Sequence, residues 1–126
     1  MSKNKDFSVD GVVAQDGDRY FVDEKGELEV IFKVACVSKT LERPHGLKYS
    51  LVLLNACDER IVCFDNAHAV SRGSGPGKRG FEQFDHKHIR GKVTPYKFTY
   101  ANTLVVDFWK EVDKFVEFEH KAEIVE

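Results

Sequence analysis

Two short polar clusters hold three of the five histidines in this chain, the side chains best suited to proton transfer at neutral pH. The first is Asp65-Asn66-Ala67-His68, and the second, after a Gly-rich stretch, is Asp85-His86-Lys87-His88. In an extended segment His86 and His88 point to the same face, about 7 Å apart. Imidazole titrates near neutral pH, so such a pair can both accept and donate a proton. The catalytic candidates are Asp65, Asn66, His68, His86 and His88.

Three interpretations of these clusters remain open from the residues alone. In the first, the histidines act as general acid and base in phosphodiester cleavage through a ribose 2′-hydroxyl, and cations stabilise the developing negative charge. In the second, a divalent metal is bound by Asp65, His68, His86 and His88, although the spacing matches no specific metal motif. In the third, the histidines are surface residues and Asp65-Asn66 is a turn.

The charge distribution favours an anionic partner near these clusters. The chain carries a formal net charge of −2, but seven basic and two acidic residues lie between Arg72 and Lys97, a local charge of +5. Such asymmetry is typical of a surface that binds phosphate. The phosphate-binding candidates are Arg79, Lys87, Arg90 and Lys92.

The elements that must position these residues indicate one α+β domain over residues 1–126. Alternating apolar residues predict strands at 20–22, 28–37, 48–54 and 60–64, with a further extended segment at 84–89 and a turn at 91–95. An apolar stripe at helical spacing predicts a C-terminal helix, capped by Thr99 or Asn102. The stripe consists of Leu104, Val105, Phe108, Val112, Phe115 and Val116. We therefore expect an antiparallel sheet of four or five strands with this helix packed on one face.

Two segments are expected to lie outside this framework. Residues 1–18 are polar and are predicted to form a loosely attached arm with one short strand at Val12-Val13-Ala14. Residues 70–84 contain four glycines and a proline, and are predicted to form a flexible loop.

From the composition we expect a cytoplasmic protein and not a membrane protein. No apolar run approaches the ~20 residues of a membrane span, and the N-terminus lacks the apolar core of a signal peptide. Cys36 and Cys63 lie in apolar runs and are predicted to be reduced, buried thiols. His45, which follows Pro44 in a polar loop, is expected to be structural.

The order of these motifs resembles the TumE-like toxins of prokaryotic toxin–antitoxin systems. The resemblance covers roughly residues 20–116, and its most specific parts are Asp65-Asn66-Ala67-His68 and Asp85-His86-Lys87-His88-Ile89. Weaker support comes from Lys48-Tyr49-Ser50-Leu51 and from Pro95-Tyr96-Lys97-Phe98 before the helix. Residues 69–84 are an insertion between the two specific motifs.

The resemblance implies the toxin of a type II system, partnered by an antitoxin that has a helix-turn-helix domain. By analogy with other small α+β toxins, we expect a ribonuclease in which histidines transfer protons, Asp65 orients a histidine and Asn66 donates to a phosphate oxygen. No cofactor is expected, with a divalent metal as the alternative. A non-catalytic protein that binds a partner, or a second copy of itself, is the alternative from a different class.

Overall fold

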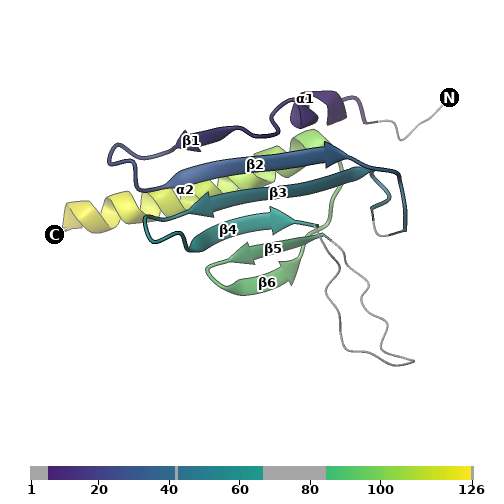
Figure 1. Ribbon diagram of the computed structural model, residues 1–126. Helices are drawn as coiled ribbons and strands as arrows, with labels where there is room; N and C mark the ends of the chain where they lie inside the picture. Colours follow the sequence, from purple (N-terminus) through teal and green to yellow (C-terminus); the bar gives the residue numbers. More distant parts are fainter. Residues whose placement is uncertain (1–5, 42, 67–84, 126) are drawn as a thin grey trace.

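The structure is a computed structural model that describes residues 6–41, 43–66 and 85–125 (Figure 1). Within these ranges the elements follow one another as α1 (Val9–Val13), β1 (Arg19–Phe21), β2 (Glu29–Cys36), β3 (Leu47–Leu54), β4 (Arg60–Asp65), β5 (His86–Ile89), β6 (Lys92–Pro95) and α2 (Ala101–Val125). The predicted loop at 70–84, His68 and Arg79 lie outside the described residues.

The strands form one sheet in which each strand pairs antiparallel with the next along the chain, from β1 to β6. The predicted α+β class is confirmed, but the sheet has six strands where four or five were expected. The difference arises at 91–95, which was predicted as a turn and instead supplies strand β6. The turn itself is only Arg90 and Gly91, both with positive φ (51° and 86°), as in the tight turns that match strand twist.

Alternate residues of the strands meet α2 in a single core, and α2 lies across one face of the sheet (Figure 1). The Phe108 ring packs edge-on against Phe32 of β2 and Phe64 of β4, with centroids 5.7 and 5.8 Å away. The predicted helical stripe is confirmed, since Leu104, Phe108 and Val112 are buried. In the part of the chain that the structure describes, no helix is long and apolar enough to cross a membrane.

The two faces of the sheet differ in what covers them. Val12 of α1 belongs to the same buried cluster as the inward residues of α2, so both described helices lie on one face. The other face, called the open face below, carries the alternate residues of each strand. Neither described helix packs on it. Each candidate catalytic residue therefore lies either on the face covered by the helices or on the open face.

The N-terminal segment is helical and anchored, and the prediction of a strand at 12–14 is wrong. Residues 9–13 form α1, and Val12 is only 4% exposed. The segment also caps α2: Ala101 N donates to Asp6 Oδ2 at 2.6 Å, and Asn102 N donates to Ser8 Oγ at 2.9 Å. The first N–H groups of α2 thus find acceptors from residues more than ninety positions away, not from the predicted caps.

This remote cap makes a pH-dependent contribution to stability. Burial raises the pKa of Asp6, but hydrogen bonds from Ser8 and from Ala101 N outweigh burial and hold the pKa below its usual value. The carboxylate therefore stabilises the fold above the ordinary aspartate pKa of about 4, and this stabilisation is lost as the pH falls below it. We expect Asp6→Ala to cost about 0.5–2 kcal/mol at pH 6.

Urea unfolding at pH 6 and at pH 3 would measure this contribution. The difference between wild type and Asp6→Ala should shrink at the lower pH, because protonation weakens the same cap in the wild type. Asp10→Ala, an exposed position in α1, is the matched control and should change stability by less than about 0.5 kcal/mol at either pH. If Asp6→Ala lowers the free energy of unfolding equally at both pH values, the ionised carboxylate of Asp6 is not what caps α2.

Candidate functional site

A row of polar side chains crosses the open face of the sheet. In the strand register Lys33 of β2 lies opposite Ser50 of β3, Ser50 opposite Asp65 of β4, and Asp65 opposite His86 of β5. Directly opposed side chains on antiparallel strands point to the same face, with Cβ atoms about 4.5–5.5 Å apart. Strand pairing thus brings a carboxylate of the first predicted cluster beside a histidine of the second.

The neighbouring row carries the second histidine. His88 lies opposite Cys63, and both stand one strand repeat from the Asp65–His86 pair on the same face. His86 is buried, at 6% exposed, whereas His88 and Asp65 are half-buried. The predicted side-by-side placement of the two histidines agrees with this register.

The thiol of Cys63 ties the two rows together but is not itself reactive. Its Sγ donates to Asp65 Oδ2 at 3.2 Å, and burial, followed by the Asp65 charge, raises the pKa of the thiol to about 12. A thiol with such a pKa is almost entirely protonated at neutral pH and is a poor nucleophile. The predicted burial is confirmed for Cys63 and is wrong for Cys36, which lies exposed at the end of β2.

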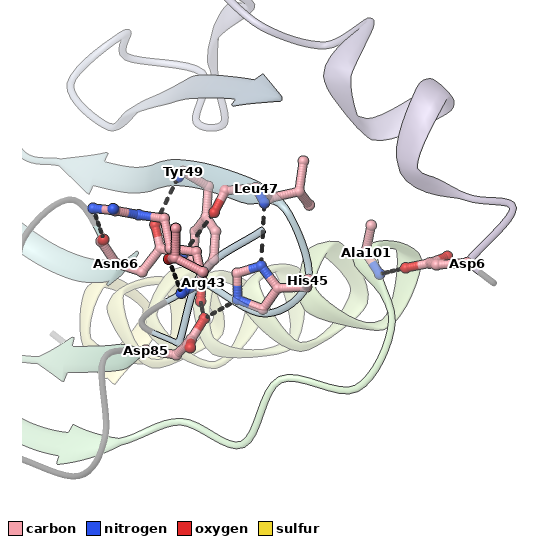
Figure 2. Close-up of polar contacts among 9 residues, drawn as sticks. Asp6, Arg43, His45, Leu47, Tyr49, Asn66, Asp85 and Ala101 are labelled. Atoms are coloured by element: carbon pink, nitrogen blue, oxygen red, sulfur yellow. Dashed lines mark hydrogen bonds and ion pairs between the residues drawn. The ribbon is translucent and has the colours of Figure 1, made fainter. Parts of the chain in front are cut away.

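Asn66 is held inside the fold on the helix side. Its Oδ1 accepts from Tyr49 N at 2.9 Å, its Nδ2 donates to Leu47 O at 2.8 Å, and the residue is 1% exposed (Figure 2). Its backbone carbonyl accepts from Arg43 Nη2 at 2.8 Å. The amide therefore extends the pairing of β3 beyond the end of β4, and both of its polar atoms are occupied by backbone groups.

A second polar centre, which sequence reasoning missed, surrounds Asp85 (Figure 2). Asp85 Oδ2 accepts from Tyr49 Oη at 2.7 Å and from His45 Nε2 at 3.0 Å. Leu47 N donates to His45 Nδ1 at 3.2 Å, so Nδ1 must be the acceptor and Nε2 must carry the proton. Burial, and then the charge of Asp85, raises the pKa of Tyr49 far above its usual value.

The His45 centre is built to hold the structure and not to react. Both ring nitrogens are bonded within the protein, and the ring packs on Phe98 with centroids 3.9 Å apart. The prediction that His45 is structural agrees with this geometry. Asp85 also accepts through its backbone carbonyl from Tyr96 N at 2.9 Å, so the residue directly before His86 is fixed from both sides.

The predicted phosphate-binding residues do not gather around the histidines in the described part of the chain. Lys87 points to the helix face, where its Nζ lies 3.9 Å from Glu111 Oε2. Arg90 lies over the rings of Phe115 and Phe118, 5.1 and 4.9 Å from their centroids. Lys92 is exposed on the edge strand β6, and Arg79 lies outside the described residues. These cations are thus separated from the Asp65–His86 row.

Two lysines on the open face stand nearer to that row. Lys33 is part of the row, and Lys48 stands two residues from Ser50 on the same face; both are exposed. Strand alternation could have identified Lys33, because the buried face predicted for the strand 28–37 leaves Lys33 on the opposite face. No face was predicted for the strand 48–54, which contains Lys48. Among the residues that the structure describes, no three His, Cys, Asp or Glu side chains are arranged to hold a metal ion.

Comparison with known proteins identifies the family. A family model described as Toxin TumE matches residues 5–116 of the chain. Neither the curated proteins nor the solved structures include a significant match. The family match begins at residue 5, and so it takes in the N-terminal segment that the sequence resemblance left out. Because the match spans most of the chain and contains both polar clusters, the chain belongs to the TumE toxin family.

Proposed function

We propose that this toxin cleaves RNA by acid–base catalysis on the open face of its sheet, with His86 and His88 as the proton-transfer groups. The observation that supports the proposal most directly is the register that sets Asp65 opposite His86 and places His88 on the same face. A carboxylate next to an imidazole can fix its tautomer and stabilise its protonated form.

In the proposed reaction one histidine takes the proton of a ribose 2′-hydroxyl. The resulting oxygen attacks the adjacent phosphorus, the bond from phosphorus to the 5′-oxygen breaks, and the second histidine protonates that leaving oxygen. The products are a 2′,3′-cyclic phosphate and a 5′-hydroxyl. Lys33 and Lys48 on the open face, and Arg60, which interacts with the Cys63 thiol opposite His88, are cations that would contact the phosphate backbone, so binding should weaken as salt rises.

The protein would act in the cytoplasm as the toxin of a type II system, and a protein antitoxin with a helix-turn-helix domain would neutralise it by direct contact.

The experiment below also tests two alternative functions. One is a metal-dependent hydrolase that uses Asp65, His68, His86 and His88, and the other is a non-catalytic protein that binds a partner or a second copy of itself.

The test is cleavage of a mixed RNA by the purified full chain, with and without EDTA, beside the double variant His86→Ala/His88→Ala. We expect cleavage that survives EDTA, yields cyclic phosphate ends, and falls by about 10²–10⁴-fold in the variant. Lys87→Ala is the matched control, because Lys87 lies between the two histidines on the same strand but faces α2. Its rate should stay within about twofold of wild type.

Three other results would contradict metal-free catalysis by His86 and His88. Loss of cleavage in EDTA would favour the metal-dependent alternative. An equal loss of RNA cleavage in Lys87→Ala would show that substitutions in β5 disturb the protein in general, and that the loss in the double variant is not specific to the histidines of the open face. No cleavage by protein that circular dichroism shows to be folded would contradict the ribonuclease proposal and favour partner binding.

A further inference from the structure

A large groove is lined by residues of the β1–β2 turn, the β3–β4 turn and the C-terminal half of α2. These three segments lie at the same end of the sheet (Figure 1). Its volume is about 1090 Å³, slightly above the range of about 300–1,000 Å³ that is typical of small-molecule sites. It is open to solvent along one side, as expected for a groove that receives a polypeptide segment and not an enclosed small molecule. Asp65 and His86 lie toward the other end of their strands.

The floor of the groove is apolar and accessible. Phe21 of β1 is 60% exposed, and beside it lie Val22, Leu28 and, from α2, Phe115 and Val116. Exposed aromatic rings in a concave surface are typical of protein interfaces, where burying them supplies much of the binding energy. The floor therefore offers anchoring positions for apolar side chains of a partner.

The rim of the groove is strongly acidic. Five acidic side chains and one lysine line it, a local charge of −4, whereas the chain as a whole carries −2. The charged lining residues are Asp23, Glu24, Lys25, Glu27, Asp113 and Glu117. Glu24, Glu27 and Asp113 are exposed, so their charge is accessible to a partner that enters the groove. Such a rim repels nucleic acid and anionic membranes, and it attracts a cationic polypeptide.

We propose that this groove receives a basic amphipathic segment of a partner protein, with apolar side chains on Phe21 and Phe115 and lysine or arginine side chains along the acidic rim. The pattern is that of helix-in-groove recognition, with the charge sign set by the rim. The inference does not depend on the RNA-cleaving proposal, because the groove shares no residue with the open-face row.

The experiment uses the full chain and two synthetic helical peptides that differ only in charge. One peptide contains leucine and lysine, and its counterpart has glutamate at every lysine position. Binding is followed by fluorescence anisotropy and located by backbone amide shifts in NMR spectra. We expect the lysine peptide alone to bind, to shift the amides of Phe21 and Val116, and to bind less tightly as salt increases.

Charge reversal identifies the surface. Glu24→Lys/Glu27→Lys should weaken binding of the lysine peptide by about tenfold or more. The matched control Asp10→Lys/Asp18→Lys makes the same change in net charge outside the groove, at the exposed Asp10 and the half-buried Asp18, and should leave the affinity within about twofold. Circular dichroism and thermal unfolding verify that each variant is folded.

Three results would overturn the proposal. The first is no binding of the lysine peptide, and the second is equal weakening by the two charge reversals, which would indicate net charge alone. The third is self-association of the wild type in sedimentation experiments that Glu24→Lys/Glu27→Lys abolishes, because the occupant would then be a second copy. RNA cleavage by the groove variants is measured in parallel. Because the groove shares no residue with the open-face row, the cleavage result tests the catalytic proposal and the peptide result tests the groove.

Discussion

Replacement of Asn66 by alanine is expected to lower the free energy of unfolding by about 2–6 kcal/mol, a large part of the stability of a small domain. The amide bridges two backbone groups of β3, Leu47 O and Tyr49 N, in a place where the side chain is 1% exposed. Alanine leaves both groups buried without partners, and each unsatisfied group costs about 1–3 kcal/mol.

The prediction is checked by urea unfolding of the purified variant beside Ser50→Ala. Ser50 lies on β3 as well, but it is half-buried on the open face, and its loss should cost less than about 0.5 kcal/mol. A loss below about 1 kcal/mol in Asn66→Ala would show that the two backbone groups find other partners. In that case Asn66 would again become a candidate for the predicted phosphate contact.

The sequence predicted the elements whose side chains follow a regular period. Leu28 to Val37 alternate as a strand buried on one face, and the stripe on α2 has helical spacing, so each pattern reports directly which residues reach the core. The segment 9–13 was missed for the opposite reason. Gly11 and the β-branched valines disfavour a helix locally, and α1 is stabilised by tertiary contacts through Val12.

Site residues were predictable only where one strand contains them. That His86 and His88 share a face follows from their spacing alone. The placement of Asp65 opposite His86 depends on how β4 pairs with β5, although twenty residues of sequence separate the two side chains, and no local pattern contains this register. Likewise the local sequence around Asn66 predicts a turn. The burial of its amide follows from two hydrogen bonds to the backbone of β3, which the local sequence does not contain.

The centre around Asp85 shows the same limit most clearly. Its partners His45 and Tyr49 stand 40 and 36 residues earlier in the chain. Their local signals are a polar loop and an apolar strand, and neither predicts a buried hydrogen-bond network. Asp85 itself was placed in the second polar cluster and counted as one charge of a basic segment, but no role in a buried network was predicted for it. Its carboxylate instead joins the β2–β3 loop, β3 and the start of β5.

Replacement of Asp85 by alanine is accordingly expected to lower the free energy of unfolding by about 2–6 kcal/mol, because two buried donors each lose their acceptor. The variant leaves the hydroxyl of Tyr49 and the Nε2–H of His45 buried without their acceptor. Tyr49→Phe removes one neutral donor and leaves the carboxylate bonded to His45, so its cost should be smaller, about 1–2 kcal/mol. Urea unfolding of both variants measures the difference.

Asp85→Asn separates hydrogen bonding from charge at this centre. Both donors reach the same carboxylate oxygen, Oδ2, so an amide oxygen in that place can accept both bonds. We expect Asn to retain more than half of the stability that alanine loses, because the cost in alanine arises from unsatisfied donors. If Asn and Ala are equally unstable, acceptance of the two hydrogen bonds does not explain the stabilisation, and the negative charge of the carboxylate is itself required.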